Sequence, residues 1–180
     1  MRLIVFGRQG AGKGTQCEKL SAHLGIPHIS TGDMLRAAVA ARTEIGLEAE
    51  RYLEEGHLVP DDVMAGVVAE RLAQEDTQQG FLLDGFPRTL PQAETLIEIL
   101  GGTVDAVVNI DVPVPVVRER MVARGRKDDT PEAIDTRLAA YEADTVPVMA
   151  LFERRGELIV LDGEGAIDEI FGRLTAALGV

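Results

Sequence analysis

A glycine-rich stretch near the start of the chain has the residue types of a phosphate-binding loop. The sequence GRQGAGKGT runs from Gly7 to Thr15, directly after the apolar run Arg2–Phe6. Glycines let consecutive backbone N–H groups turn toward one anion, and a helix that begins there adds its dipole. Lys13 supplies a point charge for the outer phosphates. The usual loop places Ser or Thr directly after this lysine to bind Mg²⁺, whereas here Gly14 follows.

An acidic residue at the end of a second apolar run offers another way to hold the metal. Mg²⁺ dehydrates reluctantly and often keeps several waters, so phosphates and water can supply most of its ligands. Asp84 ends the run Phe81–Asp84, and Arg88 follows it in the turn GFPR. Ligand sites of open α/β sheets lie at the carboxyl ends of strands. We therefore expect Asp84 to act on Mg²⁺ through water, with no direct protein ligand to the metal.

The basic residues of the chain are mostly arginines, 15 Arg against 3 Lys. Arg120 and Arg124 are four residues apart and share one face of a predicted helix, Arg126 follows, and Arg137 lies in the next predicted helix. Any one of them alone is best interpreted as a member of a surface ion pair. Several arginines that converge on Lys13 fit the transfer of a phosphoryl group between nucleotides, where electrostatic clamping is most of what a protein contributes.

Five short runs have the composition of buried strands. Most are nearly continuous apolar stretches, which is typical of parallel strands covered on both faces. The five expected strands are Arg2–Phe6, Pro27–Ser30, Phe81–Asp84, Ala106–Val112 and Glu157–Asp162.

Helical patterns fill the segments between these runs. We expect helices at Lys13–Leu24, Gly32–Leu53, Asp61–Gln74, Pro91–Leu100, Val114–Ala123, Glu132–Arg154 and Ala166–Leu178. The second of these is expected to break near Gly46, and Thr31 is placed to cap its start. Strands that alternate with helices predict an α/β fold with helices on both faces of a parallel sheet.

Composition limits the classes of function. The chain has 180 residues, enough for one domain with a sizeable core, and a net charge of −12. That charge argues against a nucleic-acid partner, which needs a basic face. No apolar run is long enough to span a membrane. Cys17 is the only cysteine, which excludes an intrachain disulfide and a Cys-based zinc site, and we expect a buried side chain there and a cytoplasmic protein.

The motifs together resemble those of adenylate kinase, a member of the nucleoside monophosphate kinase family that converts MgATP and AMP to two ADP. The matching stretches are GRQGAGKGT, STGDMLR, EEGHLVPDD, FLLDGFPRTLPQ, RGRKDD, and Arg137 with TVP, in family order over nearly the whole chain. Gly14 is a family trait, so the loop is not a damaged site. The resemblance implies the P-loop kinase fold with a five-stranded parallel sheet. It also implies a single domain, 1–180, with an AMP-binding flap at about 30–59 and a short lid at about 123–131.

The resemblance assigns roles to residues at matching positions. The implied ATP-binding residues are Gly10, Ala11, Gly12, Lys13, Gly14, Thr15, Arg120, Arg124 and Gly165. The implied AMP-binding residues are Thr31, Arg36, His57, Leu58, Val59, Gly85, Phe86, Pro87, Arg88, Gln92, Arg126 and Arg137. The implied catalytic residues are Lys13, Asp84, Arg88, Arg124, Arg126 and Arg137. Mg²⁺ enters with ATP, no structural zinc is expected, and the family suggests a monomer whose only partners are ATP, AMP and ADP.

Three features depart from the family pattern. Gln9 stands where the family loop usually has Pro, and Arg8 adds a charge beside it. His57 stands where Lys is common. The connection after Arg124 is short, whereas long-lid members carry an inserted segment there, sometimes with a zinc site.

Three alternatives remain open at this stage. A UMP/CMP kinase on the same scaffold is disfavoured by Gln92, whose amide can pair with an adenine edge. A non-catalytic nucleotide sensor would be expected to lose Lys13, Asp84 or Arg88, and all three are present. A GTP-binding switch ranks last because the chain has no NKxD motif. For the kinase we expect in-line transfer without a covalent intermediate or a dedicated general base, because the AMP phosphate is already anionic at neutral pH.

Overall fold

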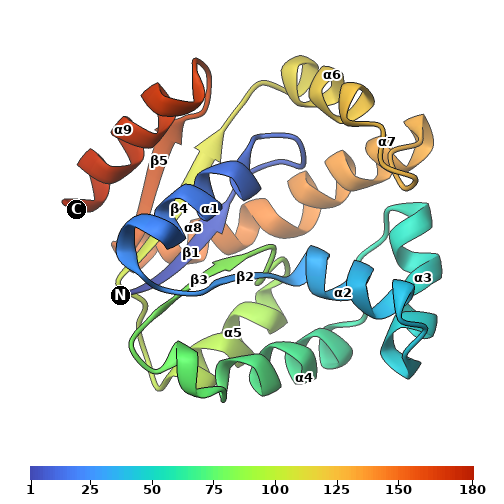
Figure 1. Cartoon of the computed structure of the whole chain (residues 1–180), viewed down its shortest axis with the longest axis horizontal. Helices are drawn as coiled ribbons and strands as arrows, with labels where there is room; N and C mark the ends of the chain where they lie inside the picture. Colours follow the sequence, from blue (N-terminus) through green and yellow to red (C-terminus); the bar gives the residue numbers. More distant parts are fainter.

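The structure is a computed structural model that describes all residues 1–180. Five parallel strands form one sheet in the order β2-β3-β1-β4-β5 (Figure 1). The strands are β1 Arg2–Phe6, β2 His28–Ser30, β3 Phe81–Asp84, β4 Ala106–Asp111 and β5 Leu158–Asp162. The predicted α/β fold with a five-stranded parallel sheet is therefore confirmed.

Nine α-helices and two shorter helical turns connect the strands. They are α1 Lys13–Leu24, α2 Thr31–Ala40, α3 Glu44–Glu55, α4 Asp61–Leu72, the 3₁₀ turn η1 Glu75–Thr77, α5 Leu90–Leu100, α6 Val114–Arg124, α7 Pro131–Ala140, the π-helical turn η2 Tyr141–Thr145, α8 Val146–Arg154 and α9 Ile167–Leu178. No helix among them is long and apolar enough to cross a bilayer.

The sheet is covered on both faces because its side chains alternate between two cores. In β1, Leu3 and Val5 belong to the core beneath α1, α6 and α9, while Ile4 and Phe6 belong to the core beneath α4, α5 and α8 (Figure 1). All four side chains are at most 4% exposed. The sheet is thus a rigid platform whose carboxyl ends carry the loops of the site.

The helix predicted at Gly32–Leu53 breaks earlier than expected. It is two helices, α2 and α3, separated by Ala41–Thr43, and Thr43 caps α3 by accepting a hydrogen bond from the backbone N–H of Gly46. Gly46 does not break the helix. It lies inside α3, where a Cβ atom would stand 2.1 Å from the carbonyl oxygen of Ala38. The glycine allows α2 and α3 to pack backbone against backbone.

The helix predicted at Glu132–Arg154 is interrupted by the π turn η2 between α7 and α8. The Tyr141 hydroxyl in this turn donates a hydrogen bond to Asn109 Oδ1 at the end of β4, over 3.1 Å. Wider π turns occur often at functional sites, and this one directs Tyr141 and Glu142 toward the glycine loop. The remaining element boundaries agree with the predictions to within two residues, while η1 was not foreseen.

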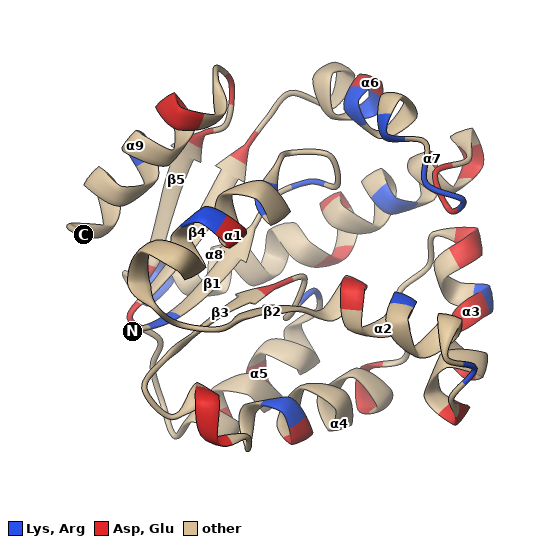
Figure 2. Cartoon of the chain, in the orientation of Figure 1, with Lys and Arg blue, Asp and Glu red and all other residues tan.

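Charge is distributed unevenly over the fold. Acidic residues outnumber basic ones, yet α6, α7 and the connection between them carry a group of basic residues (Figure 2). Arg120, Arg124 and Arg126 of this group line one cavity together with residues of the glycine loop and of α2. A local positive region therefore exists within a protein of strongly negative net charge, and beyond about 8–10 Å the overall field is screened.

Candidate functional site

The carboxyl ends of β1, β2 and β3 meet at a polar cavity. Sheet register places Asp84 beside Val5 on one side and Ser30 on the other. The cavity has a volume of about 310 Å³ and no apolar residue in its lining. Its walls are Gln9, Gly10, Gly12, Lys13, Gly14, Thr15, Glu18, Ser30, Gly32, Asp33, Arg36, Asp84, Gly85, Arg88, Arg120, Arg124 and Arg126. The fold thus brings the predicted loop, the predicted acid and five of the predicted arginines around one space.

The glycine loop holds Lys13 at the floor of this cavity. Lys13 Nζ donates hydrogen bonds to the carbonyl oxygens of Gly7 (2.7 Å) and Arg8 (3.1 Å). The pKa of Lys13 is lowered, chiefly by desolvation, while Asp84 acts in the opposite direction. Gly10 is required by geometry, because its φ is +84° and a Cβ atom would stand 2.6 Å from the carbonyl oxygen of Val117.

Arg8 does not add a cation to the cavity. Its guanidinium forms ion pairs with Asp111 (2.8 Å) at the end of β4 and with Glu142 (2.7 Å) in η2. It also lies over the Tyr141 ring, 5.4 Å from the centroid. Arg8 therefore ties the glycine loop to two other elements.

Asp84 is an ionised carboxylate at the cavity wall. Its side chain is 11% exposed, and His28 Nε2 lies 3.6 Å from Oδ2. Burial alone would raise the pKa of Asp84, but His28, Lys13 and Arg88 outweigh this effect and the pKa is lowered. The acid thus stays charged at neutral pH, as an acid that orients Mg²⁺ waters must.

Arg88 is held in a fixed position with its outer groups free. Its Nε donates to the carbonyl oxygen of Gly85 (2.7 Å), and its own carbonyl oxygen accepts from the Thr145 hydroxyl (3.1 Å). Neither terminal amino group of Arg88 has a hydrogen bond or ion pair with the protein. A planar guanidinium presented in this way can take an anion with two parallel hydrogen bonds.

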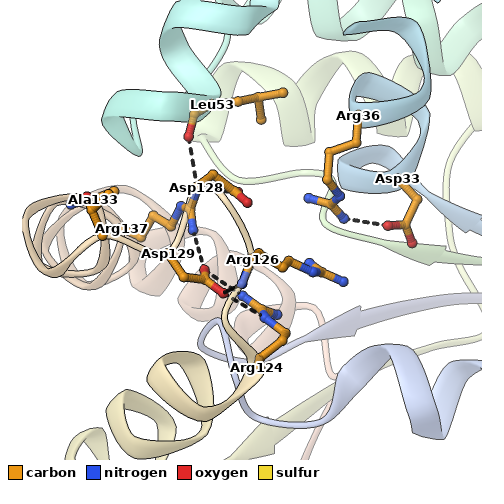
Figure 3. Close-up of polar contacts among 10 residues, drawn as sticks. Asp33, Arg36, Leu53, Arg124, Arg126, Asp128, Asp129, Ala133 and Arg137 are labelled. Atoms are coloured by element: carbon orange, nitrogen blue, oxygen red, sulfur yellow. Dashed lines mark hydrogen bonds and ion pairs between the residues drawn. The ribbon is translucent and has the colours of Figure 1, made fainter. Parts of the chain in front are cut away.

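Two of the predicted phosphate-binding arginines are paired with acids of the short connection after α6. Asp129 accepts hydrogen bonds from Arg124 (2.9 Å from both Nε and Nη2) and from Arg137 Nη1 (3.0 Å) (Figure 3). Arg137 Nη2 also contacts Asp128 and donates to the carbonyl oxygen of Leu53 in α3 (2.9 Å). The Arg126 side chain has no such partner and lines the cavity. Arg124 and Arg137 must exchange these acids for phosphate to act as predicted.

A smaller pocket adjoins the polar cavity and shares Gln9, Gly32, Arg36, Gly85 and Arg88 with it. Most predicted AMP-binding residues line this pocket: Thr31, Arg36, His57, Leu58, Val59, Gly85, Arg88, Gln92 and Arg137. Thr31 does not cap α2, because Ser30 accepts the capping hydrogen bond. The Thr31 hydroxyl instead donates to the carbonyl oxygen of Asp84 (3.3 Å), which fixes it at the pocket wall.

The amide of Gln92 is oriented by two protein contacts. Its Oε1 accepts from the Arg88 backbone N–H (2.7 Å), and its Nε2 donates to Asp61 Oδ1 (2.7 Å). Each end of the amide keeps one unused hydrogen-bonding position. The same Asp61 oxygen accepts from the Thr89 hydroxyl (3.0 Å). Sequence reasoning had read Asp61 only as a helix start, and only the packing of α4 against α5 reveals its second role.

Four predicted residues lie outside these two spaces. Phe86 is 1% exposed and packs in the core, and Pro87 lines a third small pocket with Lys13, Arg88 and Arg137. Gly165 does not line the polar cavity. It lies in the turn before α9, where an added Cβ atom would stand 2.7 Å from Glu169 Oε2. Ala11 is 1% exposed and takes part only through its carbonyl oxygen, which accepts from Arg120 (3.4 Å).

Comparison with known proteins agrees with this geometry. A family model described as Adenylate kinase matches residues 5–157. The chain is 51% identical over 183 residues to an adenylate kinase of Corynebacterium glutamicum (strain R), and the match covers 99% of each chain. It is 46% identical over 186 residues to an adenylate kinase of Xanthomonas euvesicatoria pv. vesicatoria (strain 85-10), covering 99% of this chain and 100% of the relative. An adenylate kinase of Stenotrophomonas maltophilia (strain K279a) is 46% identical over 185 residues.

Proposed function

The chain belongs to the adenylate kinase family, and from this premise we propose which role each site residue has in the reaction. The enzyme transfers a phosphoryl group reversibly from ATP to AMP and yields two ADP. The adenylate kinase interpretation of the sequence is thereby confirmed. The assignment of individual roles rests on one observation, which is the polar cavity where Lys13, Asp84 and Arg88 meet.

On the ATP side, the backbone from Gly10 to Thr15 cradles the phosphates. Successive N–H groups at the start of α1 face the cavity, and the helix dipole favours negative charge there. Lys13 contacts the transferred phosphoryl group from the cavity floor, and Arg120 and Arg124 approach it from α6. Backbone near Gly165 lies toward the adenine, a role for which the family pattern is the only support.

Asp84 and the neighbouring oxygen donors fit a site for Mg²⁺ that is held mostly through water. The Asp84 carboxylate is ionised, and the Thr15 hydroxyl lines the same wall, so hard oxygen ligands face the phosphate space. When bound, Mg²⁺ would neutralise part of the charge on the nucleotide phosphates. In this proposal Asp84 orients the waters of the ion and makes no direct bond to it.

On the AMP side, Arg36 and Arg88 hold the phosphate while Thr31 and Gln92 contact the adenine. All four line the smaller pocket, and Arg36 and Arg88 are also shared with the polar cavity. The acceptor phosphate is therefore placed next to the donor phosphates. Positioning and charge stabilisation then carry the rate, and the anionic AMP phosphate attacks in line without a general base.

Closure of the flap (about 30–59) against the lid (about 123–131) completes the site. Lys127 in the connection pairs with Glu54 in α3 (2.9 Å), so the two regions already touch. Next to this contact, Arg137 of α7 donates a hydrogen bond to the carbonyl oxygen of Leu53 in the flap (Figure 3). On binding phosphate, Arg124, Arg126 and Arg137 take the place of water around the reacting groups.

A cytoplasmic location and a monomeric state belong to the same proposal. A single cysteine is typical of a reducing compartment, and one chain supplies both pockets. A net charge of −12 makes a nucleic-acid partner unexpected.

The role of Arg88 is tested by substituting Arg88→Ala. Loss of the guanidinium removes the group shared by both phosphates, so kcat should fall by about a thousandfold or more. Initial rates of ADP formation from MgATP and AMP measure this loss, and circular dichroism checks the fold. Arg51→Ala is the matched control, because Arg51 is 75% exposed on α3 away from both pockets. If Arg88→Ala turned over within a few-fold of wild type, the assignment would be wrong.

A further inference from the structure

A second group of metal-ligating side chains lies directly behind the phosphate cavity. Cys17 from α1, His28 from β2 and Asp84 from β3 each offer one ligand atom, and these atoms lie within 4.8 Å of one another. Cys17 is 1% exposed, and the His28 side chain is 14% exposed. Of the three, only Asp84 lines the cavity. The group is therefore continuous with the phosphate site through a single carboxylate.

His28 carries an unused ligand atom that points into this group. Its Nε2 is buried and has no hydrogen-bond partner. The Asp84 Oδ2 atom lies 3.6 Å away, which is too far for a hydrogen bond. Buried polar atoms without a partner are rare in folded proteins and often mark an ion or a water. Two N and O ligands about 2.1 Å from one tetrahedral ion stand about 3.4 Å apart, close to the separation found here.

The three ligand types select a particular class of ion. Thiolate and imidazole are ligands of Zn²⁺ and similar transition-metal ions, whereas Mg²⁺ and Ca²⁺ prefer oxygen. Lys13 and Arg88 lie toward Asp84 and oppose any cation. An ion that bonds to sulfur overcomes this repulsion more readily than one that does not. Three protein ligands leave a fourth position for water, as in zinc sites that are not purely structural.

We propose that Cys17, His28 and Asp84 form a binding site for a thiophilic divalent ion such as Zn²⁺, and that its occupation inhibits phosphoryl transfer. As the metal–sulfur bond forms, the Cys17 thiol releases its proton to solvent, and no electron transfer is needed. The inhibition rests on the role proposed above for Asp84, because the ion takes the carboxylate that orients the Mg²⁺ waters. A single cysteine cannot build a zinc site of several thiolates, but here the fold adds ligands from two strands.

Cobalt binding tests the site without reference to activity. The full chain is titrated with Co²⁺, and the near-ultraviolet thiolate-to-cobalt charge-transfer band is recorded. Wild type should bind one equivalent with this band, and Cys17→Ala and Cys17→Ser should lack it. His28→Gln should bind more than about tenfold more weakly, since a direct ligand is lost. His23→Gln is the matched control and should behave as wild type, because His23 is exposed near the end of α1, against Phe171 of α9, and is not one of the three ligands.

Inhibition by Zn²⁺ tests whether occupation of the site blocks phosphoryl transfer. ADP formation from AMP with excess MgATP is measured as Zn²⁺ is raised. Without Zn²⁺, Cys17→Ala should retain the wild-type rate. With Zn²⁺, Cys17→Ala should need at least about tenfold more metal than wild type for the same inhibition.

The outcomes separate the two parts of the proposal. Absence of the thiolate band in wild type, or equal zinc sensitivity in wild type and Cys17→Ala, would overturn the site and leave the Asp84 role under "Proposed function" intact. A thiolate band with unchanged activity would overturn the inhibition, and with it that role of Asp84.

Discussion

At the scale of single residues, adenine selectivity depends on how the Gln92 amide is turned. Asp61 can only accept hydrogen bonds, so the Gln92 Nε2 group must face it and the Oε1 atom must face the Arg88 backbone. An amide without this constraint presents either end to the base. Asp61 thus contributes to the specificity of the smaller pocket without having to contact the nucleotide.

Substituting Asp61→Asn should therefore weaken discrimination among acceptors. The new amide can donate as well as accept, so Gln92 is no longer held in one orientation. We expect KM for AMP to rise about tenfold, the equivalent of one hydrogen bond, with a smaller change in kcat. Rates with AMP, UMP, CMP and GMP measure the effect. Asp62→Asn is the control, because Asp62 is exposed on the same turn. Equal AMP kinetics in the two variants would refute the orienting role.

Arg8 departs from the family pattern, and in the structure it helps to hold the glycine loop in position. Where the family usually has a proline after this residue, the chain has Gln9, and the loop is fastened instead by Arg8 to Asp111 and Glu142. Because the Arg8 carbonyl oxygen also holds Lys13, movement of Arg8 is transmitted to Lys13.

We expect Arg8→Ala to raise KM for ATP several-fold with a smaller fall in kcat. A double-mutant cycle with Glu142→Gln should give a coupling of about 0.5–1 kcal/mol in unfolding free energy, because the pair is partly exposed. Chemical denaturation and steady-state kinetics supply the two readouts. Additive effects within experimental error would show that the ion pair does not fasten the loop.

At the scale of elements, the flap is built on close packing between α2 and α3. Gly46 was predicted to mark a break, but the break occurs at Ala41–Thr43 and Gly46 marks the contact. The sequence alone does not distinguish a glycine that breaks a helix from one that allows close helix packing, because in both cases a glycine stands inside a helical pattern.

Gly46→Ala should destabilise the flap by about 2 kcal/mol, because a methyl group cannot fit 2.1 Å from a carbonyl oxygen. Gly66→Ala in α4 is the matched control, because no atom lies within 4 Å of its added Cβ. That change should stabilise the protein by about 0.5–1 kcal/mol through helix propensity. Urea unfolding measures both changes, and a neutral or stabilising effect at Gly46 would contradict the packing.

At the scale of the whole molecule, buried and hydrogen-bonded carboxylates link stability to pH. Desolvation alone would raise the pKa of Asp129, but hydrogen bonds from Arg124 and the charges of Arg124 and Arg137 lower it. Its side chain is fully enclosed. A lowered folded-state pKa contributes stability that is complete above the unfolded value of about 3.9 and is lost as pH falls through the folded value.

The melting temperature should therefore stay nearly level from about pH 7 to pH 5 and fall below about pH 4. Asp129→Asn should lower the free energy of unfolding by about 3 kcal/mol at neutral pH, because two arginines lose an enclosed partner. It should also make the fall in melting temperature at acidic pH less steep. Thermal unfolding by circular dichroism across this range is the measurement, with exposed Asp62→Asn as the control. If the melting temperature of Asp129→Asn fell with acidity as steeply as that of wild type, Asp129 would not contribute to the pH dependence of stability.

The sequence by itself determined the features that depend on neighbours along the chain. The glycine loop before α1, the buried strands and the Arg120–Arg124 face were all readable, because loop conformation, strand burial and helix faces follow from local spacing. Tertiary structure decided which elements face one another. The turn of Arg8 away from the cavity, the Asp61–Gln92 contact and the meeting of Cys17 with His28 depend on sheet order and helix packing, which no local pattern encodes.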